Sequence, residues 1–144
     1  MYTPLLYSIA SLLSFAAAVL HAALTPEHWE EWWGYGAFFL ALYIAQGVYG
    51  LLLLLVGWRA KDGQGSGRAF FVFGIIGNLL SVAMYVVSRI TGIPVFGPEA
   101  GEVEPVTVVG LVTKGIEIAL IVNLVLLARS ASTLDRTPQY SPVV

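Results

Sequence analysis

The 144-residue chain has no cysteine and few charged residues, which make up only 11% of it. The lack of cysteine excludes disulfides, thiolate metal sites and cysteine nucleophiles. Soluble domains carry about 25% charged residues, so a chain this poor in charge and 58% hydrophobic has lipid rather than water as its solvent. The net charge of -2 is too small to suggest a nucleic-acid partner.

Strand-length alternation is also absent, whereas four apolar runs are long enough to cross about 30 Å of hydrocarbon as helices. Lipid leaves no partner for open backbone groups, so only helices satisfy them. We therefore predict an all-α, four-helix transmembrane bundle in a bilayer, with spans at about 4–24, 34–56, 69–90 and 106–128. Residues 1–130 form one domain, and 131–144 form a polar, disordered cytoplasmic tail. The first run is interpreted as a span because no Lys or Arg precedes it, unlike in a signal peptide.

Two of the predicted loops, 25–33 and 96–105, contain six Glu and neither Lys nor Arg. Five of the seven basic residues flank the opposite ends of the spans: Arg59, Lys61, Arg68, Arg129 and Arg136. The positive-inside rule therefore predicts that both termini are cytoplasmic and that the acidic loops face outward. The Gly-rich segment "KDGQGSGR" (61–68) is predicted to be a flexible turn, because a phosphate-binding loop would follow a strand.

The stretch "TPEHWEEWWGYG" (25–36) is predicted to form a short interfacial helix before the second span, with Thr25 as N-cap and Pro26 at the first helical position. Its Glu and Trp residues fall on opposite faces. Two interpretations are open: an aromatic membrane-surface anchor, or a ligand or metal site at the membrane mouth. A divalent metal would be held by His21, His28, Glu27, Glu31, Glu99 and Glu102. Pro26 is expected to break the helical register between the two histidines, and haem is disfavoured because one segment cannot readily place two histidines on opposite faces of the ring.

Each predicted span carries one small or polar stripe at spacings of three and four, which is one helix face. Such stripes are typical of helix–helix contacts in lipid. The stripes are Tyr7, Ser11, Ser14, Ala18 and His21; Tyr43, Gln46, Gly47 and Gly50; Gly74, Asn78, Ser81, Tyr85 and Ser88; and Gly110, Lys114 and Glu117.

Counted inward from the predicted outer ends of the spans, Ser14, Gln46, Ser81 and Glu117 lie at a similar depth, with His21 and Arg89 near the rim. A charge at mid-helix costs roughly 2.5–3.5 kcal/mol on translocon scales, so Lys114 and Glu117 need an explanation. They are interpreted either as a self-neutralised packing pair or, as we favour, as part of an outward-open pocket. The predicted ligand-pocket residues are His21, Gln46, Asn78, Tyr85, Arg89, Lys114 and Glu117.

The segments "PEHWEEWWGYGAFFLALYIAQ" and "SRITGIPVFGPEAGEVEP" resemble small four-span membrane proteins of uncharacterised function common in high-GC bacteria. The resemblance implies a bacterial inner-membrane location and no particular activity. The first functional hypothesis is binding or transport of a cation or small polar solute from the outer side. The second is an accessory or assembly subunit of a larger membrane complex or homo-oligomer. The third is a redox subunit that binds haem, or a quinone between Tyr85, His21 and Gln46. No catalytic residues are predicted.

Overall fold

The structure, a computed structural model, describes residues 3–60, 67–93 and 97–134, which form four long helices. They are α1 (Thr3–Glu31), α2 (Trp33–Ala60), α3 (Arg68–Ile90) and α4 (Val108–Leu134). Each is long and apolar enough to cross a membrane. Even α3, with 23 residues, is about 35 Å long at 1.5 Å per residue. Residues 61–66 of the turn predicted at 61–68 and residues 135–144 of the tail predicted at 131–144 lie outside the described residues. The helix α4 continues to Leu134, past the predicted start of the tail.

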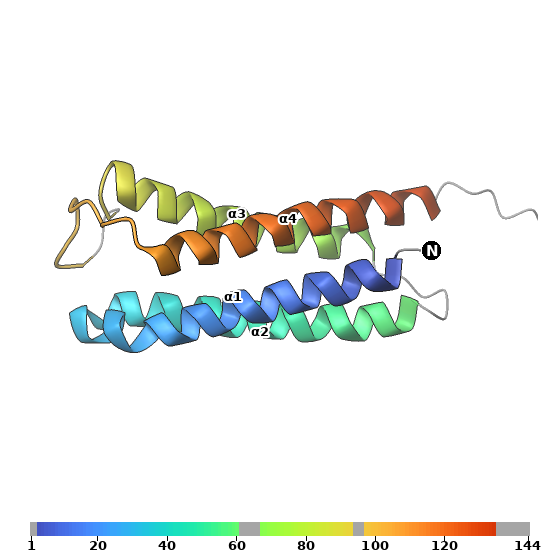
Figure 1. The fold of residues 1–144 in the computed structure, drawn as a ribbon, viewed down its shortest axis with the longest axis horizontal. Helices are drawn as coiled ribbons and strands as arrows, with labels where there is room; N and C mark the ends of the chain where they lie inside the picture. Colours follow the sequence, from blue (N-terminus) through green and yellow to red (C-terminus); the bar gives the residue numbers. More distant parts are fainter. Residues whose placement is uncertain (1–2, 61–66, 94–96, 135–144) are drawn as a thin grey trace, which may run out of the picture.

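The helices form an up-and-down bundle in which α1 lies along α2, α3 lies along α4, and α1 also contacts α4 (Figure 1). The α1–α2 turn and the α3–α4 connection lie at one end, which we call the loop end. The start of α1 and the end of α4 lie at the other, which we call the terminal end. This confirms the all-α four-helix bundle. The direction in which it crosses a membrane stays a prediction.

The outward faces of the helices carry large apolar side chains, as expected of a surface solvated by lipid rather than water. Examples from all four helices are Leu12, Val19, Trp58, Phe73, Ile90 and Val122. Inside the bundle, the half nearer the terminal end is an apolar core of Leu53, Phe71, Leu120, Leu124 and Leu127. The buried polar residues lie mainly in the half nearer the loop end, so the bundle has an apolar half and a polar half.

Tyrosines pack onto glycines of neighbouring helices, where the missing side chain leaves room for the ring. The Tyr49 ring lies where a side chain at Gly74 would be. A Cβ at Gly110 would lie 2.7 Å from Cε2 of Tyr85, closer than real Cβ contacts allow. The predicted stripes are thus helix–helix contacts, as small residues in membrane bundles usually are. Tyr43 is the exception, because α2 turns it outward and leaves it 41% exposed.

The prediction of a separate interfacial helix was wrong, because α1 continues through Pro26 to Glu31 and the chain turns at Trp32. Thr25 is not an N-cap; its Oγ1 donates a hydrogen bond to the His21 carbonyl, 2.8 Å away, as in the body of a helix. Proline removes one backbone donor and crowds the carbonyl four residues earlier, and the packing of α1 along α2 maintains the helix across that position. The expected break in register was therefore also wrong, and His21 and His28 share one helix face, with both rings against Phe39.

The connection between α3 and α4 folds back onto the loop end. The Ile93 and Gly101 amides donate to the carbonyls of Glu102 and Ile93, each at 2.9 Å. The Glu104 amide donates to the Ser88 carbonyl at 3.0 Å, which ties the connection to α3. Gly97, at φ +98°, packs against the Tyr35 ring of α2. The second acidic loop therefore reaches across to the first hairpin.

Candidate functional site

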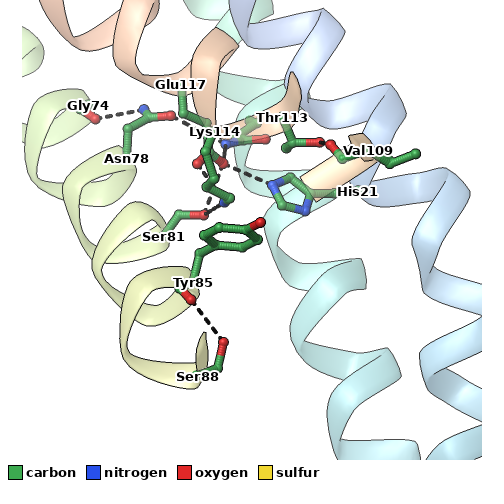
Figure 2. Close-up of polar contacts among 11 residues, drawn as sticks. His21, Gly74, Asn78, Ser81, Tyr85, Ser88, Val109, Thr113, Lys114 and Glu117 are labelled. Atoms are coloured by element: carbon green, nitrogen blue, oxygen red, sulfur yellow. Dashed lines mark hydrogen bonds and ion pairs between the residues drawn. The ribbon is translucent and has the colours of Figure 1, made fainter. Parts of the chain in front are cut away.

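Glu117 of α4, the one buried carboxylate in residues 3–60, 67–93 and 97–134, lies in the polar half of the bundle and is 0% exposed. Its Oε1 accepts hydrogen bonds from His21 Nε2, Gln46 Nε2 and Ser81 Oγ, each at 2.9 Å. Its Oε2 accepts one from Lys114 Nζ at 2.6 Å (Figure 2). All four helices thus contribute to one site. We call Glu117 and these four donors, together with Asn78, the Glu117 network.

The polar stripe of α1 holds α2 in the position that the network needs. Ser14 Oγ donates to the Gln46 carbonyl at 2.6 Å, and Ser11 Oγ donates to the Gly50 carbonyl at 2.7 Å. On the other side of Gln46, its Nε2 also lies 3.3 Å from Asn78 Oδ1. The Gln46 side chain is therefore oriented from two helices, with its amide nitrogen directed into the network.

Lys114 and Glu117 are neighbours on one face of α4, so the ammonium and the carboxylate neutralise each other inside the bundle. Lys114 Nζ also donates to Ser81 Oγ at 2.8 Å, and Ser81 passes a hydrogen bond on to Glu117. Charged hydrogen bonds of this kind are among the stronger ones. Lys114 is only 9% exposed, so it turns into the bundle rather than snorkelling to the membrane surface.

Tyr85 and Arg89 of α3 lie on the loop-end side of the network. The Tyr85 ring centroid is 5.8 Å from Lys114 Nζ and 3.9 Å from the Arg89 guanidinium carbon. Arg89 donates to Ser88 Oγ at 2.6 Å, and its Nη2 lies 3.9 Å from Glu104 Oε2 in the connection to α4. A line of polar groups therefore runs from Glu104 at the loop end, past Tyr85, to the Glu117 network.

Several buried polar atoms near Glu117 have no hydrogen-bond partner among the described residues. They are His21 Nδ1, Gln46 Oε1 and the Tyr85 hydroxyl, with Arg89 Nε on the loop-end side of the Tyr85 ring. Buried polar atoms in folded proteins nearly always have a partner. The site therefore has hydrogen-bonding capacity that the described part of the chain does not use.

Toward the terminal end, the network is bounded by the apolar core. Leu120 and Leu124, the next inward-facing residues of α4, are 0% exposed, as are Leu53 and Phe71 opposite them. Within that core, Asn123 Oδ1 has no hydrogen-bond partner among residues 3–60, 67–93 and 97–134. A surface hollow lies between α1 and α2 at the terminal end, away from the Glu117 network. It is lined by Pro4, Leu5, Tyr7, Ser8, Leu54, Gly57 and Trp58.

Five of the predicted pocket residues meet in the network: His21, Gln46, Asn78, Lys114 and Glu117. Tyr85 and Arg89 lie beside it. Ser81 was not among the predicted pocket residues, although its depth and its place in the α3 stripe could have identified it. His21 was expected near the rim but is 2% exposed, because α1 extends beyond the predicted end of its span.

The six predicted metal ligands do not form one metal site among the described residues, although Glu31 lies within electrostatic reach of His28, Glu27 and Glu99. No three His, Asp or Glu side chains in the described parts of the chain form a group that could hold a metal ion. His21 bonds Glu117, whereas His28 Nδ1 lies 2.9 Å from the Leu24 carbonyl. Glu27 and Glu31 lie at the end of α1, and Glu99 and Glu102 in the α3–α4 connection.

Comparisons with known proteins found no matching protein family, no matching curated protein and no matching solved structure. The resemblance to small bacterial four-span proteins is therefore supported only at the level of architecture: four helices able to span a membrane around a buried polar network.

Proposed function

We propose that this membrane protein binds a small polar solute at the Glu117 network. The observation that carries the proposal is a fully buried carboxylate that accepts hydrogen bonds from all four helices. Beside it lie buried polar atoms that have no partner among the described residues. Ionisable residues within a membrane are costly to bury and usually mark a pathway or binding site. A bundle that needed only packing would not require that cost.

The solute enters from the loop end. Tyr85, Arg89 and Glu104 provide polar groups between that end and the network. On the other side, Leu53, Phe71 and the leucines of α4 form a largely apolar core, in which Asn123 is a buried polar residue. The proposal is therefore binding from one side of the membrane.

The loop end faces outward and both termini face the cytoplasm. The distribution of basic residues in the sequence supports this orientation. The resemblance of the two loop segments to small bacterial proteins supports a location in the bacterial inner membrane.

The proposal can be tested with the purified protein in a mild detergent. Thermal unfolding would be followed in the presence of small amides, amines, carboxylates and divalent metals. We expect at least one class to raise the unfolding temperature in a saturable way, and this effect to disappear in Glu117→Gln. Ser11→Ala is the matched control, because Ser11 is equally buried but bonds only the Gly50 backbone, outside the network. Failure of every class to stabilise the wild type would refute the proposal.

An accessory or assembly subunit is the second candidate function. Its supporting observation is that the four donors to Glu117 come from four helices, which would also lock the bundle as a docking platform. Trp29 and Trp33 are exposed at the loop end and would contribute to a docking surface. A stoichiometric partner retained through purification, with no solute effect on the unfolding temperature, would favour this function.

A further inference from the structure

The unused hydrogen-bonding atoms beside Glu117 indicate which class of solute the site accepts. A carboxylate that receives bonds from Lys114, Ser81 and Gln46 acts only as an acceptor. His21 Nε2, 2.9 Å from the same carboxylate, therefore carries a hydrogen and donates it. In the neutral imidazole, Nδ1 is then an acceptor.

The donor and acceptor atoms of the Gln46 amide can be assigned in the same way. Its Nε2 points to Glu117 and to Asn78, so its hydrogens are used within the network. Its Oε1 is the atom without a partner among the described residues. Both buried side chains, 2% and 7% exposed, thus have an unused acceptor and no unused donor. A molecule that satisfies them must bring N–H or O–H groups.

The charges in the site restrict the solute further. Glu117 is already neutralised by Lys114 at 2.6 Å, and Arg89 lies near Glu104 on the entry side. A cation or an anion in the site would add an uncompensated charge to a buried region, which is costly unless that charge is paired. A divalent cation would in addition meet the ammonium of Lys114 beside the only buried carboxylate among the described residues.

Tyr85 provides the third contact point. Figure 2 shows its ring between Ser88 and the network, with the hydroxyl on the side of His21. The ring lies against Gly110 of α4, and the hydroxyl has no partner within the described chain. A hydroxyl can donate and accept, so Tyr85 can bind the acceptor end of a solute whose donor end reaches His21.

We propose that the Glu117 network binds a small uncharged solute with hydrogen-bond donors, such as a primary amide, which donates to His21 Nδ1 and accepts from the Tyr85 hydroxyl. This inference rests on the proposed function and specifies its substrate class. Cations, anions and molecules without donor hydrogens are poor occupants of the same site.

The test is a titration of protein labelled with 15N-histidine in detergent, in which the chain has only two imidazoles to observe. His28→Asn assigns the His21 signals. The probes are acetamide and N,N-dimethylacetamide, which has the same carbonyl but no N–H, followed by methylammonium, acetate and zinc. We expect acetamide alone to shift the His21 Nδ1 resonance in a saturable way. Tyr85→Phe, which keeps the ring against Gly110, should weaken acetamide binding about three- to tenfold, as expected from one hydrogen bond.

The outcomes separate this inference from the proposed function. A saturable His21 shift with acetate, methylammonium, zinc or N,N-dimethylacetamide, equal to or larger than that with acetamide, would overturn the neutral-donor class and leave a solute site in place. No saturable shift with any of the five probes would overturn both. Because the wild-type titration decides between these outcomes, the result does not depend on whether Tyr85→Phe folds.

Discussion

His21 Nε2 lies 2.9 Å from Glu117 Oε1, although the two residues are 96 positions apart in the chain. The bond joins α1 to α4 across the centre of the bundle, where neither side chain is reached by water. His21 Nε2 therefore depends on α4 for its hydrogen bond, whereas Glu117 also accepts from the other helices. Changes at either position test how the network contributes to stability as well as to binding.

Replacing Glu117 by Gln should destabilise the bundle by about 3 kcal/mol, because it leaves the Lys114 ammonium buried without its counter-charge. The measurement is the free energy of unfolding in mixed micelles with increasing SDS. Glu102→Gln is the matched control, since Glu102 is exposed in the α3–α4 connection and should change stability by less than about 0.5 kcal/mol. Equal stability of the two variants would contradict the ion pair.

Replacing both members of the pair, Lys114→Met with Glu117→Leu, should still destabilise the protein by at least about 2 kcal/mol. Many buried ion pairs can be exchanged for apolar residues at no loss. Here the exchange would leave the donors of His21, Gln46 and Ser81 without their acceptor. Each buried donor that finds no new partner lowers the free energy of unfolding by about 1–3 kcal/mol.

Adding Gln46→Leu to that double variant should restore part of the lost stability, because it removes one of the three stranded donors. The same unfolding measurement checks this. A double variant as stable as the wild type would mean that the three donors find other partners, and would count against the network as described.

Gly74→Ala should destabilise the bundle by about 1–3 kcal/mol, because the new methyl group would meet the Tyr49 ring. Gly77, three residues along α3, has open space at its Cβ position. Gly77→Ala should therefore be neutral or stabilising by up to about 1 kcal/mol, through higher helix propensity alone. Thermal unfolding of both variants in one detergent makes the comparison, and the opposite order would rule out the packing of Tyr49 on Gly74.

Pro26→Ala should stabilise the protein by about 1–3 kcal/mol, because Pro26 lies inside α1 and an alanine there restores a helical hydrogen bond. Pro4→Ala serves as the control, since Pro4 is in the first turn, where its missing N–H is not needed. The free energies of unfolding of the two variants, each compared with the wild type, test this prediction. A loss of stability in Pro26→Ala would instead favour the separate interfacial helix that local sequence preferences suggest.

The natural absence of cysteine allows the proposed orientation to be tested with single introduced thiols. Glu102→Cys at the loop end should react with a membrane-impermeant maleimide added to intact cells. Gly67→Cys, exposed at the start of α3 at the terminal end, should react only after the cells are permeabilised. The reverse labelling pattern would place the loop end in the cytoplasm.

The sequence by itself determined the class of solvent, the number of spans and the inward face of each helix. These follow from local quantities: apolar runs long enough for a bilayer, and polar residues repeated every three or four positions. The shared depth of Ser14, Gln46, Ser81 and Glu117 was also visible, because rise along a helix is constant. This is why most of the network could be named before the structure was known.

Tertiary structure decided which residues on those helix faces contact one another. Local preferences at Thr25 and Pro26 favour a helix start, but packing of α1 on α2 carries the helix through to Glu31. That continuation brings His21 inward from the predicted rim to Glu117. Two atoms without partners in the described structure, His21 Nδ1 and Gln46 Oε1, become identifiable only when every donor has been assigned to its acceptor. Such assignments depend on side-chain positions across four helices, which spacing along one chain does not encode.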